Sequence, residues 1–518
     1  MTVTETLNAT DDSKIVIKNQ EYWVPDKENL FLKAKLLKTI TKDKEYEVEI
    51  NLPNSSKTKI TKVNTIIPSN APYFDNVENL SQLPNLNEPS VLNNLQHRFE
   101  DGKIYTYSGL FLVAVNPYKH YESLFTDSMI QKYHLNNKKS MFHHSSSRYA
   151  ITSGFKNKGN NTNQDEDLPP HVFAIAEEAL QNLFFQQKDQ SILVTGESGA
   201  GKTENTKKIL QYLTNVLQYH DNNNNNNNKY IKDSGKVNFE DKILESNPIL
   251  ESFGNATTVK NNNSSRFGKF IKVFFNLESK MIEGTFIDWY LLEKSRVTFI
   301  DSSNERNYHI FYQLLKGIDA NPENSAFNNL QLDSLDYNKW NYLKTSKIEN
   351  NIDDLQEFNH LLAAFDKIGF SQQEQNDIYK VLSAILHLGN ISFLNKNLAN
   401  NSDKQALLSD DDHKHLEIVA DLLGIEDTKE FEISITSPKV TAGKEKVKQK
   451  KTCKQSKAII DSLAKIIYEK LFGYIVSKIN DSLKHNSADT NNNYDSFKGS
   501  SKESKILQKE NQQLIHQN

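Results

Sequence analysis

The sequence predicts an α/β fold in which a strand, a glycine-rich loop and a helix follow one another directly. The run Ile192-Leu193-Val194 is apolar and β-branched at both ends, which is typical of a strand buried on both faces. After the loop, Ile209, Leu213, Val216 and Leu217 recur at helical spacing. The loop matches the pattern G-x-x-x-x-G-K-[ST] in full, with residues Gly196, Glu197, Ser198, Gly199, Ala200, Gly201, Lys202 and Thr203.

This pattern points to a nucleoside triphosphate site. Glycines let backbone N–H groups approach phosphate oxygens, and the following helix N-terminus adds donors and a positive dipole end. Lys202 would place a charge on the β- and γ-phosphates, and the Thr203 hydroxyl would bind Mg²⁺. The alternative is a chance glycine loop that caps a helix. The complete match, with strand and helix in place, favours the nucleotide site.

The bulk composition is that of a polar, globular protein. The 518 residues carry a net charge of −4, so no global field favours nucleic acid or a membrane surface. The single cysteine, Cys453, excludes an internal disulfide and a cysteine-based metal cluster, and it fits a reducing compartment. No run approaches the ~18 apolar residues of a membrane span, and residues 1–18 lack a signal core. A cytosolic location is therefore expected.

The N-terminal part reads as an arm followed by a small β domain. Residues 1–19 are expected to be a disordered arm. Phe31–Leu37 and Tyr46–Ile50 read as short strands with polar turns, so residues 20–70 predict a small β-barrel. The alternative is a β-rich extension of the domain that follows.

The remaining segments alternate between helix, strand and polar insertion. One helix is expected to open with Asn87-Glu88-Pro89 and another to start with Pro169-Pro170; a further helix is expected over 461–483, and 290–390 is mostly helical. Strands are expected at 104–107 and 111–115, and as a hairpin at 269–275 and 281–287. Residues 136–168 read as a surface insertion, the asparagine run 222–228 as a mobile loop, and 485–518 as a polar disordered tail.

Several longer motifs resemble the myosin motor domain, in that family's order. They are NEPSVLNNL at 87–95, YTYSGLFLVAVNPY at 105–118, GESGAGKTE at 196–204, NNNSSRFGKF at 261–270, LLEKSRV at 291–297, ERNYHIFYQLL at 305–315 and LHLGNI at 386–391. The resemblance implies a P-loop NTPase of the myosin type, with a mixed central sheet surrounded by helices. An SH3-like barrel over 20–70 would precede a motor domain over 75–484.

The resemblance also implies roles for individual residues and partners. Asn116, Pro117 and Tyr118 match the loop that holds adenine, and residues 261–270 match switch I. There, Asn261 would contact the phosphates, Ser264 would face the γ-phosphate and attacking water, and Ser265 would complete the Mg²⁺ shell with Thr203. Arg266 would pair with a switch II glutamate. ATP and Mg²⁺ are the implied cofactors, actin filaments the implied partner and the actin cytoskeleton the implied location; light chains are not expected on this part of a head.

One expected motif is missing. Switch II, D-[IL]-x-G-F-E after an apolar strand, is not found, so the resemblance implies a head truncated before switch II. The run Asp366–Ser371 is a partial match, but it follows a helix. Gly369 can end that helix, and Ser371 with Glu374 can cap the next. Three hypotheses follow: an ATP-binding actin-motor head, a non-cycling pseudo-motor that binds nucleotide or partners, and a product that does not fold stably.

A basic segment precedes the last helix. Residues 443–457 contain seven lysines and one acidic residue, Glu445. Such a run predicts a solvated loop, and the alternative is a surface that binds an acidic partner. The resemblance places this segment in the actin-facing part of a myosin head.

Overall fold

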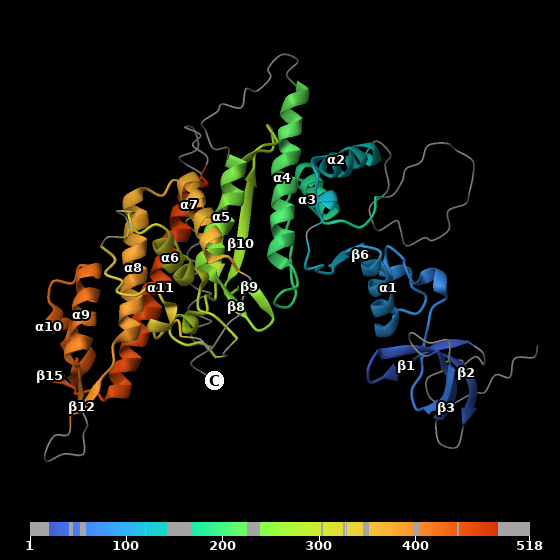
Figure 1. The fold of residues 1–518 in the computed structure, drawn as a ribbon. Coiled ribbons are helices and arrows are strands. Elements are labelled where there is room, and N and C mark those ends of the chain that lie inside the picture. The colour runs from blue at the N-terminus through green and yellow to red at the C-terminus, as the bar shows by residue number, and fades with distance from the viewer. Residues whose placement is uncertain are drawn as a thin grey trace, which may run out of the picture. The chain divides into compact units, whose positions relative to one another are not determined.

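The computed structural model describes residues 20–40, 45–51, 58–119, 121–141, 168–224, 239–301, 304–324, 327, 329–344, 352–396, 405–442 and 445–484. The chain divides into two compact units, residues 1–229 and residues 230–518, which are drawn in Figure 1. The predicted N-terminal arm, the polar tail and most of the predicted insertion at 136–168 lie outside the described residues.

The first unit begins with a five-stranded antiparallel sheet in the order β4-β3-β2-β1-β5. Its apolar side chains alternate with polar ones, which gives a small core of Tyr22, Val24, Ala34, Leu36, Val48 and Ile50. The predicted β domain is thus confirmed as a sheet. The described strands do not pair so as to close this sheet into a barrel, because β4 and β5 are not paired with each other. The strands are β1 (Glu21–Asp26), β2 (Leu30–Ile40), β3 (Glu45–Asn51), β4 (Thr58–Val63) and β5 (Ile67–Pro68).

The rest of the first unit is helical apart from one hairpin. Asn87 caps α1 by accepting the backbone N–H of Ser90, and the Trp23 indole donates to the Ser90 hydroxyl, which joins α1 to the sheet. The hairpin β6–β7 turns at Gly109, as predicted. The elements are α1 (Glu88–Glu100), β6 (Tyr105–Ser108), β7 (Phe111–Ala114), α2 (Asp127–Met141), α3 (Val172–Gln186) and α4 (Lys202–Asn224).

Three predictions for this unit need correction. The run Ile192–Val194 is not a strand, and the Leu193 side chain is 87% exposed. No described strand pairs with this run, and a strand without a hydrogen-bonded neighbour gains little from β propensity alone. Helix α2 includes residues 136–141 of the expected insertion. Helix α4 continues through Asn222–Asn224, so the asparagine run is in part helical, and its remainder lies outside the described residues.

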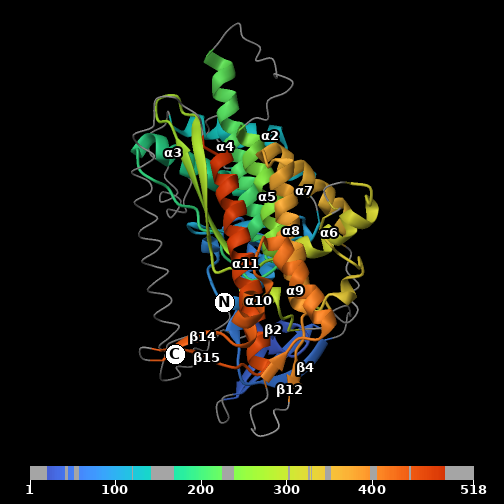
Figure 2. The same ribbon diagram turned by 90° about the vertical axis from the view of Figure 1, so that its left-hand side faces the viewer.

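The second unit is a helical body, and its described strands pair into four two-stranded antiparallel sheets. Figure 2 shows α11 running the length of this unit beside α5 and α8, and α11 contacts both of these helices. The hairpin β10–β11 is antiparallel, as predicted. The main elements are α5 (Phe239–Gly254), β8 (Asn255–Thr258), β9 (Asn261–Ser265), β10 (Gly268–Phe275), β11 (Ile282–Tyr290), α6 (His309–Ala320), α7 (Asp354–Ile368), α8 (Gln372–Asn390) and α11 (Cys453–Ser482).

The basic segment is ordered rather than a loop in most of its described length. Glu445–Lys448 forms β15, which pairs with β14, and Thr452 caps the N-terminus of α11. The solvated-loop prediction is therefore wrong for the strand and for the first turn of α11. The smaller elements around this segment are β12 (Leu394–Lys396), β13 (Gln405–Leu407), α9 (Asp410–Leu423), α10 (Thr428–Thr436), β14 (Lys439–Ala442) and β15 (Glu445–Lys448).

The partial switch II match is a junction between two helices. Helix α7 ends at Ile368, and Gly369 takes the left-handed conformation with φ 91°. Ser371 and Glu374 then form a reciprocal capping box at the start of α8. The prediction that Asp366–Ser371 is a helix end followed by a helix start is confirmed.

Candidate functional site

The glycine-rich loop of the first unit has the backbone conformation that its sequence predicts. Gly196, Gly199 and Gly201 all have positive φ, at 152°, 81° and 86°. A Cβ on Gly196 would lie 3.0 Å from the Cβ of Ala200, so the loop closes tightly on itself. Helix α4 begins at Lys202, immediately after the last glycine. The loop therefore ends in a helix N-terminus, where backbone N–H groups have no carbonyl partner within the helix.

The Lys202 side chain lies back across this loop. Its Nζ donates to the carbonyl oxygens of Gly196 and Glu197, at 2.7 Å each. These are weak acceptors compared with phosphate oxygens, which carry formal charge. The ammonium group is thus already at the loop, and a bound phosphate would offer it a stronger partner.

Two asparagine side chains hold the loop, and a tyrosine bonds to one of them. Asn116 Nδ2 donates to the carbonyl oxygen of Gly199 at 2.6 Å, and Asn205 Nδ2 donates to that of Gly201 at 3.0 Å. The Tyr105 hydroxyl in turn donates to Asn205 Oδ1 at 2.9 Å. Asn116 was predicted from the motif at 105–118, and the structure brings it to the loop. Tyr118, two residues further on, is 77% exposed. Among the contacts that the structure describes, none joins Tyr118 to the loop.

A buried histidine supports this arrangement from behind. The His171 ring lies 5.1 Å from the Tyr105 ring. Its Nδ1 accepts the backbone N–H of Phe173 and so caps α3, and its Nε2 donates to the carbonyl oxygen of Leu124. Burial lowers the pKa of His171 to about 4. The neutral ring is the form that can cap the helix, because protonation would remove the Nδ1 acceptor.

In the second unit, the segment Asn261–Arg266 forms β9 and the residue after it. Strand β9 pairs with β8 in a short hairpin. The Asn261 side chain bonds to the backbone of Asn263 in both directions, and Ser264 is buried. The segment is thus shaped by side-chain contacts more than by glycine.

Asn263 bonds to three residues outside this segment. Its Oδ1 accepts from Asn255 Nδ2 at 2.8 Å and from His309 Nε2 at 3.3 Å, and its Nδ2 donates to Glu251 Oε2. His309 is buried, and burial followed by the charge of Arg306 lowers its pKa to about 3. Asn263 and His309 were given no role from sequence. The one feature of the sequence that points to a role for these two residues is that they lie within the motifs NNNSSRFGKF and ERNYHIFYQLL.

Arg266 forms an ion pair with a carboxylate of the same unit. Its Nε donates to Glu293 Oε2 at 2.6 Å, and its Nη1 donates to the Ser264 hydroxyl at 3.1 Å. Glu293 also accepts from Arg296 Nε at 2.7 Å. Burial alone would raise the pKa of Glu293, but the hydrogen bonds from Arg296 and Arg266 hold it below its usual value. The Glu293 pairing was not predicted.

Comparison with known proteins identifies the family. The protein-family model described as myosin head (motor domain) matches residues 77–495 of this chain. The chain belongs to the myosin head family. It is 46% identical to Myosin-1 of Saccharomyces cerevisiae over 486 residues, which are 91% of this chain and 23% of that relative. It is 42% and 37% identical to Myosin type-2 heavy chains 1 and 2 of Schizosaccharomyces pombe, over 90% of this chain and 27% and 19% of theirs.

These comparisons confirm the resemblance to the myosin motor domain that the sequence motifs carried. They also define its extent, because the chain spans between 19% and 27% of the length of these three relatives. In the part of the myosin head that the structure describes, no helix is long and apolar enough to cross a membrane.

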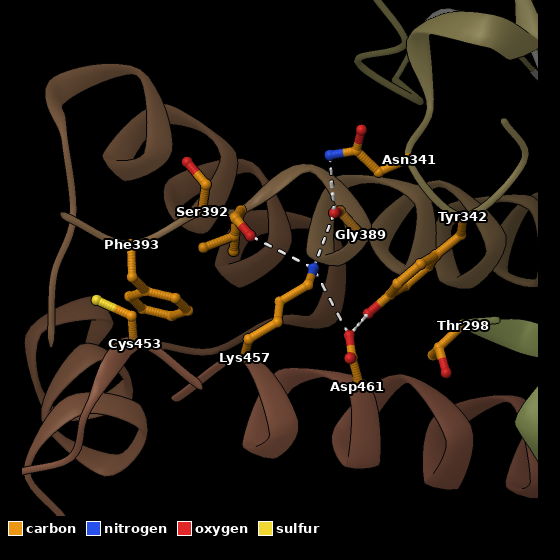
Figure 3. Close-up of a pocket in the computed structure, with 10 residues that line it drawn as sticks. Thr298, Asn341, Tyr342, Gly389, Ser392, Phe393, Cys453, Lys457 and Asp461 are labelled. Atoms are coloured by element: carbon orange, nitrogen blue, oxygen red, sulfur yellow. Dashed lines mark hydrogen bonds and ion pairs between the residues drawn. The ribbon is translucent and has the colours of Figure 1, made fainter. Parts of the chain in front are cut away.

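The second unit of this myosin head also contains a cavity of about 390 Å³, shown in Figure 3. Lys457 lies at its centre and donates to the carbonyl oxygens of Gly389 and Ile391, at 2.9 and 3.4 Å, where α8 ends. Asp461 pairs with Lys457 and accepts from the Tyr342 hydroxyl. Burial lowers the pKa of Lys457, and the same cause raises that of Tyr342. The polar groups at the centre are hydrogen-bonded to one another, so we interpret this network as a clamp, a set of bonds that holds α11 against the end of α8.

The residues at the phosphate loop fit a magnesium nucleotide. A polyphosphate needs hydrogen-bond donors, and this loop offers them as backbone N–H groups between three glycines with positive φ, as the N-terminus of α4 and as the Lys202 ammonium group. Thr203 lies in the first turn of α4, where a hydroxyl can bind Mg²⁺ together with phosphate oxygens. Among the described residues, no three His, Cys, Asp or Glu side chains are grouped so that they could hold a metal ion.

Proposed function

We propose that this chain binds Mg²⁺·ATP through residues 196–203, as the nucleotide-binding part of a myosin-type head that acts on actin filaments. The observation that carries the proposal is the Lys202 ammonium group, held across a loop of three left-handed glycines at the start of α4. Family membership supports the same function. Actin binding, ATP hydrolysis and a place in the actin cytoskeleton belong to whole myosins, and they are part of this proposal.

The proposal assigns a role to each residue group that the sequence indicated. The backbone of residues 196–202 and the Lys202 side chain hold the phosphates, and Thr203 and Ser265 bind Mg²⁺. Asn116, Pro117 and Tyr118 contact adenine; the hydrogen bond between Asn116 and Gly199 supports a place for the first of them beside the loop. Asn261, Ser264 and Arg266 respond to the γ-phosphate.

The experiment is a titration with a fluorescent ATP analogue in the presence of Mg²⁺. Lys202→Ala removes the charge on the phosphates and should weaken binding about a hundredfold, the equivalent of ~3 kcal/mol. The matched control is Lys207→Ala, which removes another lysine of α4; Lys207 pairs with Glu204 on the same helix. The control should bind as the wild type does. Equal affinity in Lys202→Ala and wild type contradicts the assignment.

A second candidate function is nucleotide binding without turnover. The observation that favours it is that Arg266 already holds a carboxylate, Glu293, in this chain. In a cycling head the same guanidinium would have to serve the closed, hydrolysing state. Steady-state phosphate release, measured with and without actin filaments, separates the two functions. Actin-stimulated release that disappears in Arg266→Ala supports a motor, and binding without release supports the second function.

A further inference from the structure

We propose that Glu293 is the positioning residue for the segment Asn261–Arg266, which we call the switch segment. Glu293 fixes the Arg266 guanidinium and, through it, the buried hydroxyl of Ser264. The inference rests on the proposed function only where it concerns nucleotide; the ordering of the segment itself is independent of it.

The contacts between Glu293 and the switch segment are both side-chain and backbone contacts. Besides the 2.6 Å bond from Arg266 Nε to Glu293 Oε2, the backbone N–H of Glu293 donates to the carbonyl oxygen of Arg266 at 2.9 Å. Arg266 then passes the constraint on, because its Nη1 reaches the Ser264 hydroxyl at 3.1 Å. A guanidinium can do this since its donors are fixed in one plane, whereas an ammonium group has a single centre.

Glu293 is itself held from the opposite side. Arg296 donates to both of its carboxylate oxygens, at 2.7 and 3.4 Å, and the Tyr308 hydroxyl donates to its backbone carbonyl at 2.9 Å. Arg296 is buried, with 5% of its side chain exposed, and is fixed further by Glu305 at 2.9 Å. The carboxylate is therefore anchored in the body of the unit before Arg266 is considered.

The two arginines differ in their surroundings. The Arg266 side chain is 26% exposed, against 5% for Arg296. If Arg266 moved away, Glu293 would keep its buried partner and would not become an unpaired charge. Glu293 is thus a fixed point, and Arg266 is the group that can leave it. This asymmetry is what a positioning residue needs, since its own place does not depend on the segment that it orders.

The first test measures amide hydrogen exchange across residues 255–266 in the full chain without nucleotide. Glu293→Gln keeps the shape but removes the charge that holds Arg266, so exchange in this segment should rise about tenfold. The matched control is Glu305→Gln, which removes a carboxylate from the same arginine network without a described contact to Arg266. Exchange that rises equally in both variants would show a general loss of stability and would overturn the proposal.

The second test asks whether Glu293 acts through Arg266. Release of a fluorescent ATP analogue should be several-fold faster in Glu293→Gln than in wild type and unchanged in Glu305→Gln. In an Arg266→Ala background, adding Glu293→Gln should change nothing further, because the group that Glu293 positions is absent. An effect of Glu293→Gln that persists without Arg266 contradicts the inference.

The outcomes separate this inference from the proposed function. If the wild type does not bind nucleotide, the proposed function fails, and the exchange measurement still decides the role of Glu293. If Glu293→Gln does not fold, Arg266→Lys gives the same test, because an ammonium group lacks the forked geometry that reaches Glu293 and Ser264 together. Exchange in Arg266→Lys that matches the wild type would then overturn the proposal.

Discussion

The phosphate loop and the switch segment are two short stretches with related predicted roles, and they are held in different ways. The phosphate loop takes its shape from backbone conformation: three glycines with positive φ and the start of α4. The switch segment is strand β9 followed by Arg266, and its Asn263 and Arg266 side chains bond to four surrounding elements or loops. The first depends on what its backbone can adopt, and the second on what its side chains touch.

The difference shows where mutations should act. In the phosphate loop, a change of residue type should affect ligand binding more than the remaining fold, because the backbone conformation of three glycines shapes the loop. In the switch segment, a change should affect stability and function together, since the same contacts serve both. The two regions nevertheless share one feature, a buried neutral histidine nearby. In the first unit it is His171, and in the second unit it is His309.

The largest expected effect is on stability at low pH. An unfolded histidine has a pKa near 6.5, and the folded values are about 4 for His171 and about 3 for His309. The unfolded chain therefore binds more protons between these values, so the stability from the neutral rings is full above pH 6.5 and is lost as pH falls towards 4 and 3. Between pH 7.5 and pH 5 each histidine should cost about 2 kcal/mol.

Chemical denaturation at pH 7.5, 6 and 5 checks this, and one variant separates the two histidines. His171→Asn keeps a side-chain acceptor for the α3 N-terminus but cannot titrate. It should remove the His171 share of the pH dependence and leave the His309 share. An unchanged pH dependence in this variant would mean that the helix cap behind the phosphate loop is not sensitive to acid.

The next effect tests the backbone control of the phosphate loop. Gly201→Ala forces a Cβ into the left-handed region, at a strain of about 1–2 kcal/mol, although the space at this position is sufficient. Nucleotide affinity should fall about tenfold, because the strained loop cannot keep its shape. Gly109→Ala is the matched control: it has φ +61°, open space around it and a place in the β6–β7 turn. It should show a similar loss of stability with unchanged nucleotide affinity; equal affinity losses would contradict backbone control of the loop.

Much of this fold could be predicted because its signals are local. The cap at Asn87, the left-handed Gly369 and the capping box of Ser371 and Glu374 are set by residues within one helical turn of each other, and the structure has all three. The hairpins at 104–115 and 269–287 follow from alternation and from turn residues. The glycine conformations of the phosphate loop belong to the same local class.

The features that escaped prediction depend on partners far away in sequence. Whether Ile192–Val194 becomes a strand depends on a neighbouring strand, and no composition signal reports one. The pairing of Arg266 with Glu293 joins residues 27 positions apart, and the bond from His309 to Asn263 joins residues 46 apart. Single-residue patterns carry no information on such pairs, so the side-chain network of the switch segment had to come from the structure.

The smallest effect sharpens the view that contacts control the second unit. The Tyr342 hydroxyl donates to Asp461 at the cavity of Figure 3, and Tyr342→Phe removes this bond while keeping the ring. The free energy of unfolding of the second unit should fall by about 1 kcal/mol, with no change in nucleotide affinity.

The matched control for Tyr342→Phe is Tyr379→Phe in α8. The Tyr379 hydroxyl is buried, and among the residues that the structure describes it has no hydrogen-bond partner. Its removal should leave stability unchanged or raise it slightly, because an unsatisfied buried hydroxyl costs free energy. Chemical denaturation of the two variants measures the difference directly. If both lose the same stability, the loss belongs to the buried ring environment rather than to the hydrogen bond, and the clamp between α8 and α11 does not depend on Tyr342.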